Sequence, residues 1–190
     1  MKNAKKKPYS EMTIGELEAL AEQGYANTQF GLASRYYNGE GVEKNLEKAV
    51  KWYTKAAEQG NPYAQNNLAL CYKYGEGVRK SYKKAVEWFT KAAEQGLPEA
   101  QYELAEIYCE GNLIKRDPAK AVAWYTKAAE QGFTMAQNNL AMCYKEGLGV
   151  EKDLVKALEW AIKAADNGDE EARNTVLEIQ QEMSEKVSRP

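Results

Sequence analysis

Residues 52–60 read WYTKAAEQG, and the same nine letters return at residues 124–132, with WFTKAAEQG at residues 88–96. The glycine that closes this stretch recurs at a constant interval, at Gly24, Gly60, Gly96, Gly132 and Gly168. A period in the thirties is typical of helix–turn–helix repeats, which bury their apolar faces only by stacking on their neighbours. We therefore expect an all-α solenoid of 36-residue repeats with about ten helices.

A predicted first helix opens each repeat. In the second repeat, Ala64, Leu68 and Tyr72 are spaced as i, i+4 and i+8, which places them on one face of a helix. A glycine follows the end of this helix, where a residue in the left-handed conformation commonly closes a helix. These glycines are Gly39, Gly75, Gly111 and Gly147.

A predicted second helix follows the turn that this glycine begins. Helix-capping residue types precede it, namely Asn45, Ser81, Asp117 and Asp153. All four tryptophans share one position of the second helix, as Trp52, Trp88, Trp124 and Trp160. The third repeat departs from the pattern, because Leu113 stands where other turns have glycine and would be costly at a positive φ. We expect that turn to differ locally.

The repeats also predict how the chain is divided. We expect a basic tail over residues 1–12, a single solenoid over residues 13–185 and a second tail over residues 186–190. The solenoid would comprise a start-cap helix at 13–23, four full repeats at 25–168 and a final helix at 169–185. The start cap carries Glu16 in place of tryptophan, and Thr13 with Glu16 forms a capping box.

Charge and hydropathy exclude some partners. The formal charge is −2 although Lys2, Lys5, Lys6 and Lys7 crowd the predicted tail, so the folded body is mildly acidic. A nucleic-acid surface needs clustered basic residues on the folded face, and we expect none. No stretch approaches the roughly 18 apolar residues of a membrane helix, so we expect no membrane partner.

The three cysteines are predicted to remain free. Cys71 and Cys143 occupy the same place two repeats apart, and helices packed about 8–10 Å from each other keep them beyond disulfide range. Thiols without paired spacing indicate a reducing compartment. We expect a cytoplasmic monomer that holds no cofactor and no metal.

The recurring residues resemble the Sel-one-like repeat family, a branch of the tetratricopeptide-like solenoids. The shared pattern is Ala-Gln early in the first helix, Leu-Ala then Tyr, a G-x-G-Val turn, Lys-Ala-x-x-Trp-Tyr, and a closing Ala-Ala-x-x-Gly. It covers residues 13 to about 180. The resemblance implies a right-handed superhelix whose first helices line a concave surface, and an adaptor that binds other proteins or peptides.

Comparing the repeats separates recurring positions from variable ones, and the variable positions of the first helix share one face. Amides on this face could hold a peptide backbone, while tyrosine and methionine offer adaptable apolar contact. The predicted partner-binding residues are Phe30, Tyr37, Tyr63, Asn66, Asn67, Leu70, Tyr74, Glu99, Tyr102, Glu103, Glu106, Glu110, Met135, Asn138, Asn139 and Met142. The alternative is that these are ordinary solvated residues.

Four glutamates of the third repeat form one stripe of the predicted first helix, at Glu99, Glu103, Glu106 and Glu110. Like charges at i, i+4 repel one another, so a basic partner segment would offset a local instability. A hydrated helix face is the alternative interpretation. A third is a consensus-like or architectural scaffold that has no ligand.

The residue types give little support to the hypothesis that the protein is an enzyme. The chain has no histidine, which removes the usual general base near neutral pH. Residues 81–84 match S-x-x-K, the nucleophile signature of penicillin-recognising hydrolases, but its companion motifs are absent. Glu103 and Glu106 could pair as glycosidase carboxylates, yet nothing would enclose a sugar on an open face. We predict a protein that is not an enzyme.

Overall fold

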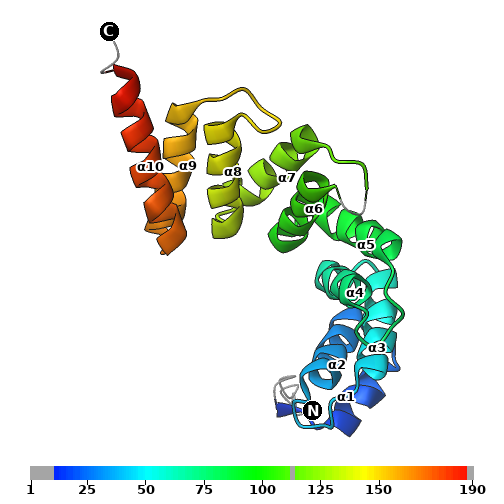
Figure 1. Cartoon of the computed structure of the whole chain (residues 1–190). Coiled ribbons are helices and arrows are strands. Elements are labelled where there is room, and N and C mark those ends of the chain that lie inside the picture. The colour runs from blue at the N-terminus through cyan, green and yellow to red at the C-terminus, as the bar shows by residue number, and fades with distance from the viewer. Residues whose placement is uncertain (1–10, 112–113, 188–190) are drawn as a thin grey trace. The chain divides into compact units, whose positions relative to one another are not determined.

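The computed structural model describes residues 11–111 and 114–187, and this part of the chain contains helices and no strand. The helices are α1 (Ile14–Ala21), α2 (Ala26–Asn38), α3 (Leu46–Glu58), α4 (Pro62–Tyr74), α5 (Tyr82–Glu94), α6 (Pro98–Glu110), α7 (Pro118–Glu130), α8 (Thr134–Glu146), α9 (Leu154–Asp166) and α10 (Glu170–Val187) (Figure 1). The predicted all-α fold of helix pairs is confirmed. The expected departure at Leu113 and the basic residues of the tail lie outside the described residues.

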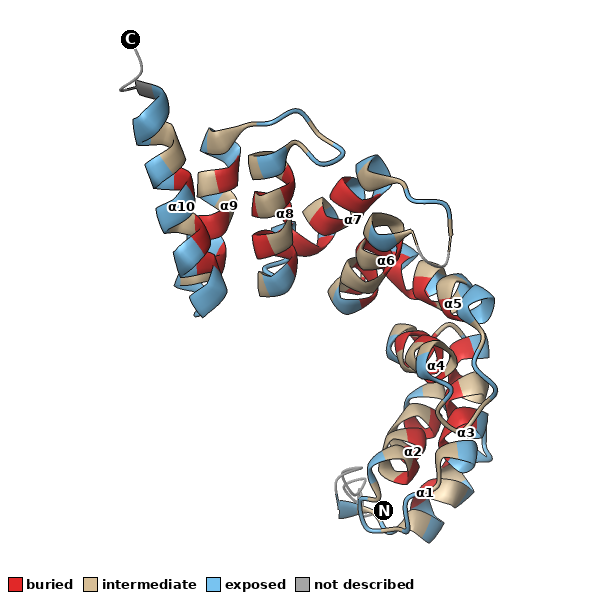
Figure 2. Ribbon diagram, viewed as in Figure 1, coloured by how far each residue is buried: buried red, intermediate tan, exposed pale blue. Residues whose placement is uncertain are grey.

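The chain divides into two compact units, residues 1–92 and residues 93–190. In the first unit α1 packs on α2, α2 on α3, and α3 on α4. In the second unit α6 packs on α7, α7 on α8, α8 on α9, and α10 on both α9 and α8. Buried residues lie where helices of a unit face one another, and exposed residues lie on the opposite sides (Figure 2). Each unit is thus a stack of helices in which neighbouring helices cover one another's apolar sides.

The helix ends follow the sequence closely. Thr13 and Glu16 form the predicted capping box of α1. The carboxylate of Asp153 accepts from two backbone N–H groups of α9, and the side chain of Asn45 accepts from one backbone N–H group of α3, that of Lys48. The glycines that close four of the first helices have φ between 71° and 79°. Local capping therefore sets the length of each helix.

A buried glutamine joins α1 to α2, α3 to α4, α5 to α6 and α7 to α8, whereas Arg173 holds the equivalent position of α10. Gln137 is 4% exposed, and its Nε2 donates to the carbonyl of Ala129 at 3.1 Å. Its Oε1 accepts from Nδ2 of Asn167 at 2.9 Å. The same donation recurs from Gln29 to Ala21, from Gln65 to Ala57 and from Gln101 to Ala93. Because the last carbonyls of a helix lack intrahelical partners, these amides satisfy groups that packing has buried.

The turn between two helices packs against the preceding repeat through a glycine. Gly77 has φ 67°, and a Cβ atom there would lie 2.3 Å from the carbonyl oxygen of Leu46, at the start of α3. Gly149 approaches the carbonyl of Pro118 equally closely in the second unit. Gly41 has φ 69° at the equivalent place, but a Cβ there would meet nothing within 4 Å.

Each tryptophan of the second helices carries a lysine over its ring. The Nζ atoms of Lys55, Lys91, Lys127 and Lys163 lie 3.9–4.0 Å from the ring centroids of Trp52, Trp88, Trp124 and Trp160. Only Trp52 is fully buried, and the other three rings are half-buried. The lysine stems therefore cover apolar surface that packing leaves partly open, which contributes about 0.5–1 kcal/mol for each pair.

Replacing Gln137 with methionine should lower the free energy of unfolding by about 1–3 kcal/mol, because the buried carbonyl of Ala129 loses its donor while the side-chain volume is nearly unchanged. Urea unfolding would measure the loss. Gln180→Met is the matched control on exposed surface of α10 and should change the stability by less than about 0.5 kcal/mol. Equal losses in both variants would contradict the role of Gln137.

Gly77→Ala should destabilise the protein more than Gly41→Ala. Both variants place a Cβ at a positive φ, at a cost of about 1–2 kcal/mol, but only the first also drives it into the backbone of Leu46. We expect the difference between the two free energies of unfolding to exceed about 1 kcal/mol. Indistinguishable urea midpoints would show that the close approach at Gly77 contributes nothing.

Candidate functional site

The first helices of the repeats are α2, α4, α6 and α8, and we call the face formed by their variable positions the first-helix face. In the first unit, this face is organised around the hydroxyl of Tyr53, which comes from the second helix α3. This hydroxyl lies 3.2 Å from Oγ of Ser34 on α2 and accepts from Nδ2 of Asn67 on α4, also at 3.2 Å. The rings of Phe30 and Tyr37 pack beside it, with centroids 5.9 Å and 6.3 Å from that of Tyr53. Two consecutive first helices are thus joined by one buried tyrosine.

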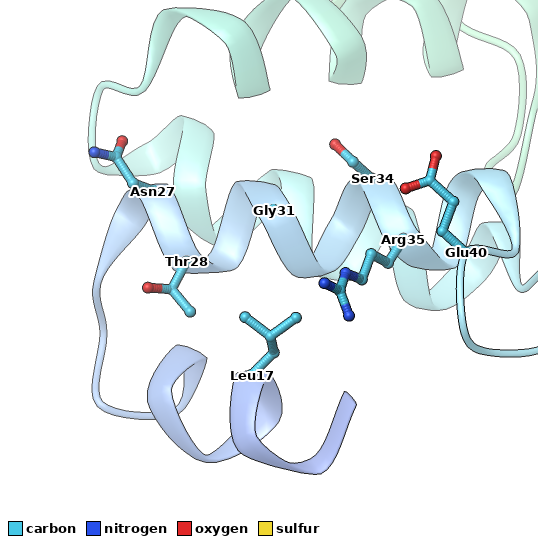
Figure 3. A pocket seen from close by; sticks show the side chains of 7 residues that line it. All are labelled: Leu17, Asn27, Thr28, Gly31, Ser34, Arg35 and Glu40. Atoms are coloured by element: carbon cyan, nitrogen blue, oxygen red, sulfur yellow. The ribbon is translucent and has the colours of Figure 1, made fainter. Parts of the chain in front are cut away.

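Two hollows lie on this face. A small one of about 80 Å³ is lined by Tyr37, Tyr53, Asn67 and Leu70, which brings three of the predicted partner-binding residues together. The other, of about 340 Å³, lies between α1 and α2 (Figure 3) and is lined by Leu17, Asn27, Thr28, Gly31, Ser34, Arg35 and Glu40. In the next repeat Tyr53 takes the place of Leu17, and the rings of Phe30 and Tyr37 pack against it.

In the second unit, the same position holds a charged cluster. The hydroxyl of Tyr125 on α7 donates to Oε1 of Glu106 on α6. Nδ2 of Asn139 on α8 donates to the same carboxylate oxygen at 2.8 Å and lies 3.2 Å from the Tyr125 hydroxyl. Burial and the Glu106 carboxylate both raise the pKa of Tyr125, so its hydroxyl stays a donor. We call Glu106, Tyr125 and Asn139 the carboxylate cluster.

Two predicted partner-binding residues are covered by the protein itself. Asn66 and Asn138 are 9% and 7% exposed, whereas the sequence analysis placed both on an open face. The reason is visible at Asn138, because α10 packs on α8 and Thr175 Oγ donates to Asn138 Oδ1 at 3.3 Å. At Asn138 this position of a first helix meets the next first helix rather than solvent.

The remaining predicted residues form an exposed group and a half-buried group. Tyr63, Tyr74 and Met135 are 55%, 59% and 51% exposed. Glu99 and Glu110 are also exposed, whereas Glu103 and Met142 are half-buried. Half-buried Tyr102 packs its ring against Tyr125 and Phe133, with centroids 6.0 Å and 5.3 Å away.

Tyr53 and Tyr125 were not predicted as site residues, because an aromatic residue recurs at their position in three repeats, which is typical of a packing position. Their hydroxyls nevertheless reach the first-helix face. A signal was present in the sequence: tyrosine at this position is followed 14 residues later by asparagine in both cases, whereas Phe89 is followed by Glu103. A phenylalanine offers no hydroxyl for an amide to reach.

No cluster of side chains suited to holding a metal ion occurs within residues 11–111 and 114–187. Across the same ranges, no helix has both the length and the apolar character needed to cross a lipid bilayer. Burial raises the pKa of the Cys71 and Cys143 thiols to about 12, so they stay protonated near neutral pH. The surface chemistry of the face therefore comes from carboxylates, amides, phenols and thioethers.

Tyr125→Phe should lower the free energy of unfolding by about 2 kcal/mol and Tyr53→Phe by about 1 kcal/mol. The first hydroxyl donates to a charged acceptor, and hydrogen bonds to charged groups are worth roughly twice those between neutral groups. Chemical denaturation of both variants checks the order. A larger loss for Tyr53→Phe would show that the Glu106 carboxylate adds nothing to the cluster.

Comparison with known proteins finds the repeat directly. The Sel1 repeat profile matches residues 26–61, 62–97, 98–133 and 134–169. The crystal structure of a protective antigen present in uropathogenic Escherichia coli strains, which displays an SLR fold, is 42% identical with a TM-score of 0.83, over 85% of this chain and 35% of that one. A comparison with curated protein sequences found no match.

Two further crystal structures are similar. A Sel1 repeat protein from Oxalobacter formigenes is 39% identical with a TM-score of 0.78, over 86% of this chain and 65% of that one. Cysteine rich protein B of Helicobacter pylori is 26% identical with a TM-score of 0.55, over 72% of this chain and 98% of that one. The chain thus spans about a third and about two thirds of the length of the Escherichia coli and Oxalobacter proteins. Four consecutive matches cover most of its residues, and the chain belongs to the Sel1 repeat family.

Proposed function

We propose that this protein is a non-enzymatic adaptor of the cytoplasm, which binds a basic segment of another protein on the first-helix face of its second unit. Sel1 repeat proteins generally act as scaffolds for protein–protein interaction, which supports the general role. The carboxylate cluster supports the choice of a basic segment.

Glu106 is the observation that carries the proposal. Its carboxylate is half-buried and is held by two neutral donors, Tyr125 and Asn139. Among the described residues it has no cationic partner. A carboxylate has about four acceptor sites, so two hydrogen bonds fix its position and leave room for more. A lysine or arginine from a partner would supply the missing charge with a charge-assisted hydrogen bond.

The surroundings of Glu106 suit an extended peptide. Glu99 is exposed on the same stripe of α6 and adds negative charge, which would favour the approach of a basic segment. Met135 is 51% exposed on α8 and offers a flexible apolar contact. The one lysine of the α8 face, Lys145, is already paired with Glu178 at 2.6 Å and so does not neutralise the cluster.

The test is a selection of linear peptides from a display library on the immobilised protein, followed by fluorescence anisotropy with the enriched sequences. We expect enrichment of peptides that contain lysine or arginine, and a dissociation constant that rises with salt. Glu106→Gln removes the charge and keeps one acceptor oxygen, which can still accept from both Tyr125 and Asn139. It should weaken binding about tenfold, as expected for the loss of one charge-assisted contact.

The matched control is Glu130→Gln, which removes the same charge from an exposed site at the end of α7. It should leave the dissociation constant within about twofold of the wild-type value. Equal weakening by both variants would mean that the loss of affinity comes from the change in net charge and not from the position of Glu106. Selected peptides without basic residues, or unchanged affinity of Glu106→Gln, would contradict a basic partner on this face.

A further inference from the structure

A second charged surface lies away from the first-helix face, on the turn that joins α4 to α5. A groove of about 420 Å³ is lined there by Tyr72, Val78, Arg79, Lys80, Ser81 and Lys84, and we call it the basic groove. Residues 79–84 read RKSYKK, four cations without a carboxylate. No cluster of basic residues was predicted on the folded body, and this one is confined to a single turn.

The cations of the basic groove are not neutralised by neighbours. Arg79 has no ion-pair partner among the described residues. Lys80 lies over the Tyr82 ring at 4.5 Å, and Lys84 reaches the Tyr72 hydroxyl at 3.4 Å. The only carboxylate of the turn is Glu76, which accepts from the Tyr37 hydroxyl at 2.6 Å on the first-helix face. Positive charge therefore remains exposed on one side of the turn.

The equivalent groove of the fourth repeat has ion pairs that the basic groove lacks. It measures about 630 Å³, and its cations are internally paired. Lys156 lies 3.6 Å from the carboxylate of Asp153, and Lys152 lies 2.8 Å from that of Glu182. In the third repeat Lys120 pairs with Asp117 at 3.4 Å. The second repeat has Ser81 where these repeats have aspartate, so Lys84 lacks the corresponding carboxylate.

We propose that the basic groove binds an acidic segment of another polypeptide. One carboxylate of that segment would take the place that the Asp153 carboxylate holds in the fourth repeat, beside Lys84. A second would pair with Arg79, whose planar guanidinium can donate two parallel hydrogen bonds to one carboxylate. The site is separate from the first-helix face, so the protein would hold two segments of opposite charge.

A short acidic peptide fits this groove better than a nucleic acid. The cations belong to one turn and form no extended track along the chain, as a nucleic-acid backbone would require. The protein carries a net charge of −2, which repels a long polyanion at a distance while a local pair of carboxylates still meets local cations. The groove also contains the Tyr72 hydroxyl, which can hydrogen-bond a carboxylate.

The experiment measures fluorescence anisotropy of a fluorescein-labelled peptide of alternating glutamate and serine, titrated with the whole chain. Ser81→Asp supplies the carboxylate found at Asp117 and Asp153, and should weaken binding at least about tenfold. Ser81→Asn copies Asn45, keeps the helix cap without charge, and should bind as the wild type does. Since the chain itself uses both residues at this position, both variants should fold.

Arg79→Glu provides a second variant, because glutamate occupies this position at Glu43 and Glu151. It should also weaken binding at least about tenfold. Lys51→Glu makes the same change of charge at an exposed position of α3. It should leave the affinity within about twofold of the wild-type value. Equal effects of Lys51→Glu and Arg79→Glu, or unchanged binding by Ser81→Asp, would overturn the proposal. So would single-stranded DNA of the same charge if it bound more tightly than the peptide.

Discussion

The buried glutamine amides are the interaction on which the stacking of this protein depends. A second helix ends with carbonyls that have no partner within the helix, and the next first helix covers them. Gln137 and its three equivalents supply the donor at four of these junctions, so the carbonyls of Ala129, Ala21, Ala57 and Ala93 are buried without losing a partner. Since the amide must reach a particular carbonyl, it also fixes how one helix pair lies on the next.

That geometry decides which side chains are available for other molecules. Positions of a first helix that face the following first helix are used internally, as Asn138 is by Thr175. Positions near the second-helix tyrosine are held in place but stay half-exposed, as Glu106 and Asn139 are. A rigid carboxylate costs less conformational entropy to bind than a mobile one, so the packing that supports the repeats also prepares the surface.

Much of the fold could be predicted from the sequence, because capping, glycine turns and apolar spacing are local. Gly75 and Asp153 perform the roles that their residue types suggest. The face was predicted less well, since the comparison of repeats separates recurring from variable positions and does not reveal contact with the next helix. Asn138 varies like a surface residue and is buried. Tyr125 recurs like a core residue, yet its hydroxyl belongs to the face.

The basic groove depends on Arg79, where two other repeats have glutamate, and on the exchange of aspartate for serine at one helix cap, Ser81. Nothing in that exchange disturbs helix formation, because Ser81 still accepts from the backbone N–H of Lys84 at 3.5 Å. The carboxylate that pairs with the lysine three residues later in the third and fourth repeats is lost, however. Such an exchange is tolerated because a cap acts only on the first turn of the helix that it begins.

The tyrosine–asparagine pairs have one more consequence, which concerns errors in assembly. Near-identical repeats can associate in a wrong order, since one second helix offers much the same apolar surface as another. A slip of one repeat would set Phe89 against Asn67 or Tyr125 against Glu103, whereas a slip of two repeats would set Tyr53 against Asn139. A slip that set Phe89 against Asn67 would leave that amide without the hydroxyl it meets at Tyr53, whereas a slip of two repeats would supply a hydroxyl again.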